Sequence, residues 1–266
     1  MNRKTFLAIA AVVTMLALPA RADFIDNFDT YAVGSLNGLG GWTVDTGTLN
    51  VTAAASVSAP NSVVWASSAS SRAYRPIGGT GVAATALDWS FRFNDVGATR
   101  DYNALYAYTG AWTVGLQTVM CLGDYNSVSG KYMGRYSSIT GATYADGAAT
   151  DGWTGGWFTL GNGGGAGVTM GKTNGWHLFE VKGMADPVNT GRVEFQYYID
   201  NNLVGTVANL TSYNLTYATI GGAISVGITG GNTDNYSVVP EPSSVALCLL
   251  GGFSVAAGAI SRRRKA

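Results

Sequence analysis

The stretch Leu87-Asp88-Trp89-Ser90-Phe91-Arg92-Phe93 alternates strictly between apolar and polar side chains. Successive side chains of a β-strand point to opposite faces of a sheet, so the four apolar side chains share one face and the three polar ones share the other. This period of two predicts a strand with one buried and one solvated face. The segment Val193–Ile199 repeats the pattern, and Asp200-Asn201-Asn202 then predicts a tight turn into Leu203–Val207, as in a β-hairpin.

Short apolar or alternating runs, separated by glycine, asparagine and serine, extend this pattern over the body of the chain. We predict further strands at 62–66, 104–108, 113–122, 132–136, 157–160, 176–181, 223–228 and 236–239. No body window of ten or more residues combines helical periodicity with a cap, and glycine is abundant, at 37 of 266 residues. These features predict an all-β fold, a single β-sandwich or a barrel.

The first 22 residues carry a targeting pattern. A basic start at Arg3 and Lys4, an apolar run over 6–18 and the small-residue pattern Ala20-Arg21-Ala22 predict a secretory signal peptide, a short helix cleaved before Asp23. We therefore expect export and signal peptidase machinery to handle the chain. Residues 23–238 are expected to form the β-sandwich domain, and residues 239–266 a separate tail.

Three features follow one another in the tail. Pro240, Glu241 and Pro242 interrupt regular structure, and an uncharged apolar run over 245–260 comes next. The chain then carries four basic residues, Arg262, Arg263, Arg264 and Lys265. The apolar run is shorter than the ~20 residues with which a helix crosses a bilayer, which favours a short transmembrane helix that holds the protein transiently. The basic residues would orient it with its end in the cytoplasm.

This order of features resembles the PEP-CTERM sorting signal of exported bacterial proteins. In that family an exosortase, a membrane protease, recognises the Pro-Glu-Pro region, and the host typically makes extracellular polysaccharide. The resemblance implies that Pro240, Glu241 and Pro242 form the sorting motif. It also implies passage from the inner membrane to the cell surface or extracellular matrix. An ordinary C-terminal anchor is the alternative.

Charge and cysteine content limit the classes of partner and fold. Seven of the 16 basic residues but only one of the 16 acidic residues lie in the two end segments. The body therefore carries nine basic against fifteen acidic residues, a net charge of −6, and such a field repels phosphate backbones, so no nucleic-acid partner is expected. Cys121 is the single cysteine of the body, which excludes a disulfide framework and predicts a small buried side chain.

Several segments of the body carry a second resemblance. Phe24–Tyr31 with Gly34-Ser35-Leu36 and Gly41-Trp42, then Asn174–His177, the hairpin over 198–205 and Asp234–Val238 resemble concanavalin A-like, laminin-G-like domains. The resemblance implies a lectin-like jelly roll whose last strand pairs near the first. No cofactor is required, but these domains often hold one structural Ca²⁺ where the two strands meet. Asp26, Asp29 and Asp234 fall on the matching segments, with solvated surface carboxylates as the alternative.

Patterns that indicate catalysis are scarce, and we expect the protein not to be an enzyme. His177 is the only histidine and no serine lies in a Gly-x-Ser-x-Gly context, so His177 is expected to be structural and hydrogen-bonded to a neighbour. Glu180 and Glu194 are the only glutamates of the body, and a glycosidase would need them to converge. The glycine-rich segment 161–167 has no helix after it, which favours a flexible surface loop over a dinucleotide site.

Aromatic residues crowd the middle of the body, namely Tyr102, Tyr106, Tyr108, Trp112, Tyr125, Tyr132, Tyr136, Tyr144, Trp153 and Trp157. A ring offers a flat apolar face to a sugar, and polar neighbours bond its hydroxyl groups. Trp153 and Tyr125, in polar loops, are the candidate glycan contacts, while most of the rings are expected in the core or on strand surfaces. The leading hypothesis is a surface protein that binds or organises extracellular polysaccharide. A purely structural or adhesive protein, which buried rings would favour, and a polysaccharide-degrading enzyme are the alternatives.

Overall fold

The computed structural model describes residues 24–65, 71–79, 81–97, 102–108, 116–123, 130–136, 141–148, 156–221 and 231–240, with 116–123 described as backbone only. One compact unit of the chain is Ala22–Val239. Within the described ranges every regular element is a strand, which confirms the all-β prediction. No helix in these ranges is long and apolar enough to cross a membrane. The predicted signal helix and the predicted span in the tail lie outside them.

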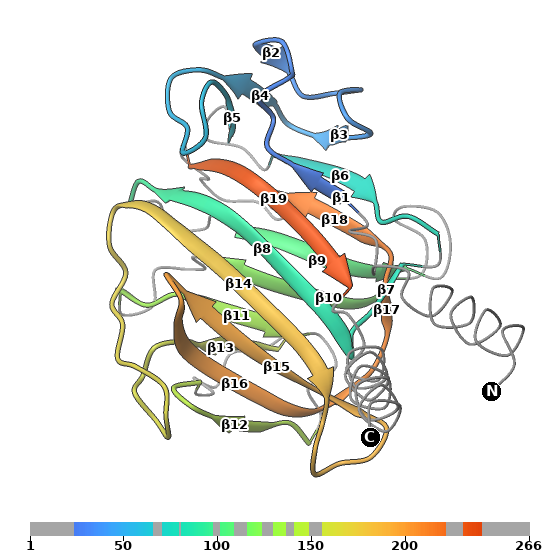
Figure 1. The fold of residues 1–266 in the computed structure, drawn as a ribbon, viewed down its shortest axis with the longest axis vertical. Coiled ribbons are helices and arrows are strands. Elements are labelled where there is room, and N and C mark those ends of the chain that lie inside the picture. Colours follow the sequence, from blue (N-terminus) through green and yellow to red (C-terminus); the bar gives the residue numbers. More distant parts are fainter. Residues whose placement is uncertain are drawn as a thin grey trace, which may run out of the picture. The chain divides into compact units, whose positions relative to one another are not determined.

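Ten strands form the larger of two sheets: β1 (Phe24–Asp26), β2 (Gly34–Ser35), β4 (Leu49–Thr52), β5 (Ser62–Trp65), β8 (Ala86–Asp95), β12 (Thr143–Ala145), β14 (Gly175–Ala185), β15 (Arg192–Ile199), β16 (Asn202–Thr211) and β19 (Asn232–Pro240). Their order is β12-β16-β15-β14-β8-β19-β5-β4-β2, and β1 pairs with β19 beside this path. The long strands β14, β8 and β19 occupy the centre of the sheet (Figure 1).

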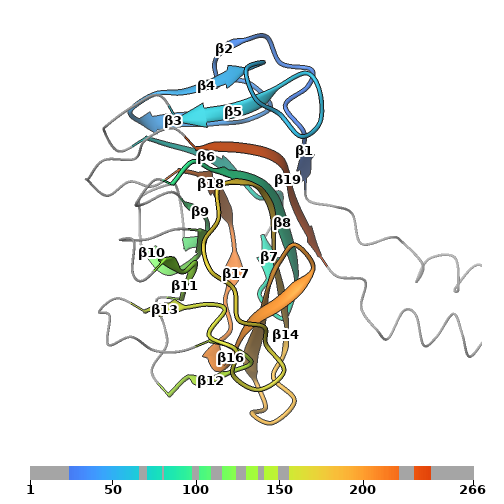
Figure 2. The ribbon, with the colours of Figure 1, turned by 90° about the vertical axis from the view of Figure 1, so that its left-hand side faces the viewer.

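Seven strands form the smaller sheet: β3 (Thr43–Thr46), β6 (Arg72–Pro76), β9 (Tyr102–Tyr108), β10 (Leu116–Gly123), β11 (Met133–Tyr136), β13 (Trp157–Thr159) and β18 (Tyr217–Ile220). Their order is β13-β11-β10-β9-β18-β6-β3. A short ribbon pairs β7 (Val82–Ala83) with β17 (Asn214–Leu215). Figure 2 shows the two sheets as facing layers, which establishes a β-sandwich.

The core between the layers explains why β8 forms. Leu87, Trp89, Phe91 and Phe93 are fully buried, while the residues between them are half-buried on the other face, so the predicted alternation is confirmed. The ring of Phe91 stacks on that of Tyr236 from β19, with centroids 5.8 Å apart. Burying a large apolar side chain of this kind contributes about 1.5–3 kcal/mol, so this strand is a main source of the sandwich's stability.

Two predicted connections are also confirmed. Asp200 and Asn201 join β15 to β16 with φ angles of 49° and 64°, the positive values that a two-residue hairpin turn of type I′ requires. Asparagine and aspartate tolerate such angles better than most residues. The last strand also lies against the first, because Phe24 of β1 pairs with Val238 of β19.

The strands β6 and β18 were not predicted from the sequence, although they lie side by side in the smaller sheet. Each is short and has a small alanine, Ala73 or Ala218, among its inward-facing residues, so the apolar alternation is weak. Other short strands, such as β4, were also missed. The strand predicted at 223–228 lies outside the described residues.

The glycine-rich segment 161–167 is a packed loop, which corrects the expectation of a flexible one. The Gly161 N–H donates to the Val204 carbonyl oxygen at 2.7 Å, and the Ala166 N–H donates to Asp146 Oδ1 at 2.7 Å. A Cβ atom on Gly167 would lie 2.0 Å from the Asp146 carbonyl oxygen. The glycines therefore allow a backbone approach that a side chain would prevent, and this is a structural role.

Candidate functional site

The outer face of the smaller sheet, turned away from the core, gathers aromatic side chains from separate parts of the chain. The strand register pairs Tyr106 of β9 with Tyr217 of β18, and Thr219 of β18 with Tyr74 of β6. Because residues two apart share a face of a strand, Tyr74, Tyr106, Tyr108 and Tyr217 all lie on this outer face. We call these four residues the tyrosine face.

The four rings contact one another in sequence across three neighbouring strands. Tyr106 and Tyr108 stack with centroids 5.6 Å apart, Tyr108 meets Tyr217 edge-on at 5.6 Å, and Tyr217 meets Tyr74 edge-on at 5.9 Å. Tyr106 and Tyr108 are buried, with 6% and 9% of their surface exposed, whereas Tyr74 and Tyr217 are half-buried. The first two therefore support the second two, which present ring surface to the solvent.

An ion pair lies at the β3 side of the tyrosine face. Arg72, two residues before Tyr74, donates from Nε to Asp45 Oδ1 at 3.1 Å and makes a second contact to Oδ2. Burial alone would lower the pKa of the Arg72 guanidinium, but the hydrogen bond and the charge of Asp45 raise it. Burial raises the pKa of the nearby Tyr108 phenol, which keeps it a hydroxyl at neutral pH. Fixed polar groups thus border the aromatic surface.

The aromatic cluster on this face continues, as buried rings, towards the opposite edge of the smaller sheet. The Arg135 guanidinium lies over the Trp157 ring, 5.2 Å from its centroid, and the Tyr102 ring meets Trp157 edge-on at 5.7 Å. Tyr102 and Trp157 are both buried. This end of the face is therefore packed more completely than the end at Tyr74 and Tyr217.

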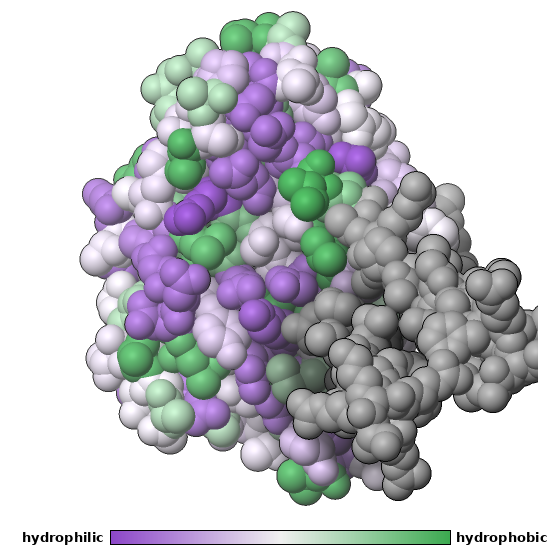
Figure 3. Space-filling view, viewed as in Figure 1, coloured by the Kyte–Doolittle hydropathy of each residue, from purple (hydrophilic) through white to green (hydrophobic). Residues whose placement is uncertain are grey.

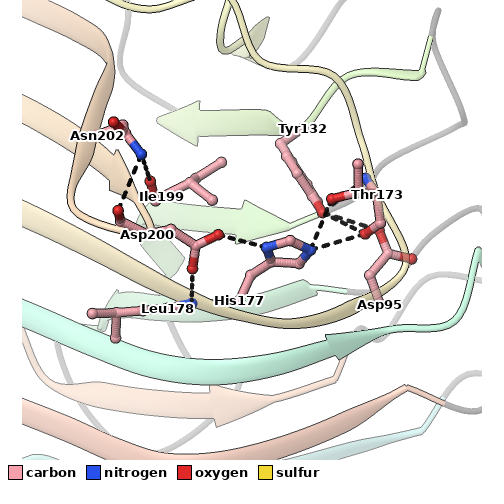
Figure 4. Close-up of polar contacts among 8 residues, drawn as sticks. All are labelled: Asp95, Tyr132, Thr173, His177, Leu178, Ile199, Asp200 and Asn202. Atoms are coloured by element: carbon pink, nitrogen blue, oxygen red, sulfur yellow. Dashed lines mark hydrogen bonds and ion pairs between the residues drawn. The ribbon is translucent and has the colours of Figure 1, made fainter.

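A second polar cluster surrounds the only histidine (Figure 4). His177 Nδ1 lies 2.7 Å from Asp200 Oδ2, and Nε2 lies 2.9 Å from the Thr173 carbonyl oxygen and 3.1 Å from Thr173 Oγ1. The Tyr132 hydroxyl donates towards the same carbonyl oxygen at 3.1 Å and lies 3.3 Å from Asp95 Oδ2. As expected, His177 is a strand residue that is hydrogen-bonded to its neighbours.

The two body glutamates do not converge. Glu180 of β14 lies opposite Tyr198, and Glu194 of β15 lies opposite Met184, so the two carboxylates are offset by four residues, about 13 Å along the strands. Glu180 instead contacts Lys182 Nζ at 3.2 Å, and Glu194 accepts a hydrogen bond from a neighbouring glutamine. Both belong to the outer face of the larger sheet, where Figure 3 shows a broad hydrophilic band. The carboxylate pair considered for a glycosidase is therefore not formed.

Asp26, predicted as a calcium ligand, is instead the centre of a buried hydrogen-bond network. Its Oδ2 atom accepts from the Tyr31 hydroxyl at 2.7 Å, from Trp42 Nε1 at 2.8 Å and from Arg75 at 3.1 Å. Its Oδ1 atom accepts from the Phe28 N–H at 3.0 Å. A calcium ion at this carboxylate would have to displace a guanidinium cation, so the donor set does not fit the metal.

The other two predicted calcium ligands, Asp234 and Asp29, accept hydrogen bonds from backbone N–H groups of different segments. Asp234 accepts from the N–H groups of Val57 and Ser58 at 2.9 and 3.0 Å, and Asp29 accepts from the Asn61 N–H at 3.2 Å. Burial raises the pKa of Asp234 in spite of these donors. Over the ranges that the structure describes, no group of three or more His, Cys, Asp or Glu side chains is placed to hold a metal ion.

Trp153 and Tyr125, the predicted glycan contacts, lie outside the described residues, as do Glu241, Pro242 and the basic residues of the tail. Pro240 is the last residue of β19. Cys121 lies in β10, of which only the backbone pairing is described. Among the other central aromatic residues, Tyr132 and Tyr136 are buried in the core, and Tyr144 packs against it.

Tyr74, Tyr217 and Arg72 were not singled out by the sequence analysis. Tyr217 lies far along the chain from the aromatic-rich middle, and only the pairing of β18 with β9 brings it there. The one local signal is the alternation Arg72-Ala73-Tyr74-Arg75, which is compatible with a short strand but does not say which sheet it joins.

Comparison with known proteins finds similarity of fold only. No family model matches the chain, and no curated protein matches it. Among solved structures, a carbohydrate esterase from the Shiga toxin-encoding bacteriophage phi24B aligns with TM-score 0.47 and 16% identity, over 84% of this chain and 99% of that one. An alginate lyase from Chlorella virus aligns with TM-score 0.46 and 11% identity, over 79% and 98%. The Emp47p carbohydrate recognition domain aligns with TM-score 0.43 and 12% identity, over 85% and 99%.

These comparisons correct the expectation that the protein is not an enzyme. The matched structures include a carbohydrate esterase and several alginate or polysaccharide lyases as well as a recognition domain. The prediction that the protein is not an enzyme is therefore wrong, because structures matched by its body include enzymes. At these identities and TM-scores the likeness concerns the fold alone, and it identifies neither an activity nor a substrate for this chain.

Proposed function

We propose that this protein is an exported surface or matrix protein that binds extracellular polysaccharide through the tyrosine face of a lectin-like jelly roll. The observation that carries the proposal is the placing of the half-buried Tyr74 and Tyr217 on adjacent strands, beside the Arg72–Asp45 pair. In this proposal the signal peptide directs export, and the tail is processed by an exosortase that recognises Pro240, Glu241 and Pro242.

The chemistry of the tyrosine face suits a ligand that has both apolar faces and many hydroxyl groups. Tyrosine rings offer flat apolar surface, and their hydroxyl groups and the ion pair offer donors and acceptors. The strands hold Tyr74 and Tyr217 in place through the rings packed against them, so little conformational freedom is lost on binding. Polysaccharide meets these requirements better than an apolar or strongly anionic ligand.

The buried rings alone would favour a purely structural protein, and Tyr74 and Tyr217 separate the two hypotheses. Isothermal titration of the full chain with the producing bacterium's polysaccharide would compare Tyr217→Ala and Tyr74→Ala with Tyr198→Ala. Tyr198 is a matched control, because it is a half-buried tyrosine on the outer face of the larger sheet. We expect up to about tenfold weaker binding for each of the first two variants, since a ring contact contributes about 0.5–1.5 kcal/mol, and no change for the control. Equal affinity in all three variants would refute the proposal.

A further inference from the structure

The segment Lys172-Thr173-Asn174, which we call the strap, crosses one end of the sandwich immediately before β14. The Lys172 N–H donates to the Gly130 carbonyl oxygen at 2.6 Å, and Lys172 Nζ lies 3.5 Å from Asp95 Oδ1 at the end of β8. The Thr173 N–H donates weakly to the Tyr132 hydroxyl at 3.4 Å. The strap thus contacts Asp95, the last residue of β8 in the larger sheet, and Tyr132, which immediately precedes β11 of the smaller sheet.

His177 adds a contact to the strap, and the strength of this contact depends on whether the imidazole ring is protonated. Its Nδ1 atom faces a carboxylate oxygen of Asp200, and its Nε2 atom faces the carbonyl oxygen of Thr173 (Figure 4). Both partners accept hydrogen bonds and cannot donate them. Only the imidazolium form, in which each ring nitrogen carries a hydrogen, satisfies both contacts at once.

We infer that the imidazolium form of His177 fastens the strap across the end of the sandwich, and that the strap loosens when the ring loses its second proton. The carboxylate is the stronger acceptor, so Nδ1 keeps its hydrogen in the neutral ring. Nε2 then turns a lone pair towards the Thr173 carbonyl oxygen, 2.9 Å away, and can only accept from the Thr173 hydroxyl at 3.1 Å, so a weaker neutral hydrogen bond replaces the charge-assisted one. The strap is therefore held more firmly at acidic pH and loosens as the pH rises, because histidine is the side chain that changes charge near neutrality.

The charged and titratable groups around the ring favour this direction. Asp200, in the turn between β15 and β16, attracts the cation and is held in place by the Leu178 N–H, which donates to its other oxygen at 2.9 Å. Asp95 at the end of β8 and Lys172 in the strap neutralise each other. Burial raises the pKa of Tyr132, immediately before β11, so this phenol stays an uncharged donor near neutral pH.

The same contacts decide against a nucleophilic triad at this cluster. Thr173 Oγ1 lies 3.1 Å from Nε2 and Asp200 lies on the other nitrogen, an order that resembles nucleophile, base and orienting acid. A base would need a free lone pair on Nε2, but that atom also faces a carbonyl oxygen at a shorter distance. The geometry instead indicates that Nε2 donates a hydrogen bond to the Thr173 carbonyl oxygen and so holds the strap in place.

The test uses the full chain, in which His177 is the only histidine and gives the only imidazole signals. Nitrogen NMR follows the ring's protonation with pH, and hydrogen exchange follows opening at the Lys172 and Thr173 amides, corrected for intrinsic exchange rates. We expect the opening constant to rise about five- to tenfold as the ring becomes neutral, as when a neutral hydrogen bond replaces a charge-assisted one. The Val181 amide in the middle of β14 is the internal control and should not respond.

Two variants make the outcome decisive. His177→Gln cannot become charged, so its strap opening should not change over the pH range in which the wild-type ring titrates. Asp200→Asn keeps the histidine but removes the charge that favours the cation, so the strap should loosen at a lower pH. Strap opening that is equal on both sides of the measured ring titration would overturn the inference, as would an unprotonated ring nitrogen in the acidic form.

Discussion

Replacing Asp26 with asparagine tests the account of how the first strand is held to the sandwich. The substitution preserves the shape of the side chain but removes its charge and turns one acceptor oxygen into an NH₂ group. That group would face Trp42 Nε1 and the Arg75 guanidinium, both of which only donate. If the amide turns over instead, the Phe28 N–H loses its acceptor.

The expected cost follows from the burial of the partners. Trp42 is fully buried, so an unpaired Nε1 costs about 1–3 kcal/mol. Breaking a buried ion pair costs about 3–5 kcal/mol, but 22% of the Arg75 side chain is exposed and regains part of its hydration. We therefore expect Asp26→Asn to lower the free energy of unfolding by about 3 kcal/mol. For a domain of this size that corresponds to a melting temperature about 6–12 °C lower.

Urea unfolding of the full chain, followed by tryptophan fluorescence, measures this loss directly. Asp29→Asn is the matched control, because the same chemical change is made three residues along at a partly exposed carboxylate. We expect a loss below about 1 kcal/mol there, since the amide oxygen still accepts from the Asn61 N–H. Equal losses for the two variants, or a loss below about 1 kcal/mol for Asp26→Asn, would refute the claim that the Asp26 hydrogen-bond network holds β1 to the sandwich.

Three further results are expected. Gly183→Ala should destabilise the protein by about 1–3 kcal/mol or more in urea unfolding, because its Cβ would lie 2.0 Å from the Ala84 carbonyl oxygen, whereas Gly171→Ala, with no heavy atom closer than 3.9 Å, should be nearly neutral. Although burial alone would raise it, hydrogen bonds from the Asn189 side chain and from three backbone N–H groups lower the pKa of Asp186 from 3.8 to about 2. This contribution to stability is therefore present above pH 4 and is lost as the pH falls from about 4 to about 2, and Asp186→Asn should remove that part of the acid dependence of the unfolding midpoint. Lys131→Met should lower the melting temperature, because Nζ donates to the carbonyl oxygens of Gly161 and Met170 and anchors the glycine-rich loop.

The sequence predicts the larger sheet well because its strands carry their own signal. β8 and β15 each bury every second residue, and the Asp200-Asn201 turn has the residue types that positive φ angles favour. β6 and β18 carry too few large apolar residues to show the same alternation. They become strands because β9 and β3 provide pairing partners, which no local window reveals.

The candidate site was harder to predict than the fold for a related physical reason. Its aromatic side chains belong to three strands that are distant in sequence, and the register between those strands decides which rings meet. Local sequence patterns pointed to Trp153 and Tyr125, whose loops have the right composition, but they could not identify Tyr217. Asp26 shows the converse case, in which a carboxylate at an expected metal position binds protein donors that only the folded chain brings together.

Hydrogen exchange of the full chain, with and without the producing organism's polysaccharide, tests the central claim most directly. If the tyrosine face is the binding surface, the peptides that contain β6, β9 and β18 will exchange more slowly on binding, while those of β8 and β14 in the larger sheet will not change. Protection confined to β8, β14 and β15 would place the ligand on the opposite face and contradict the account. Absence of protection in every peptide, at a saturating concentration of polysaccharide, would contradict it as well.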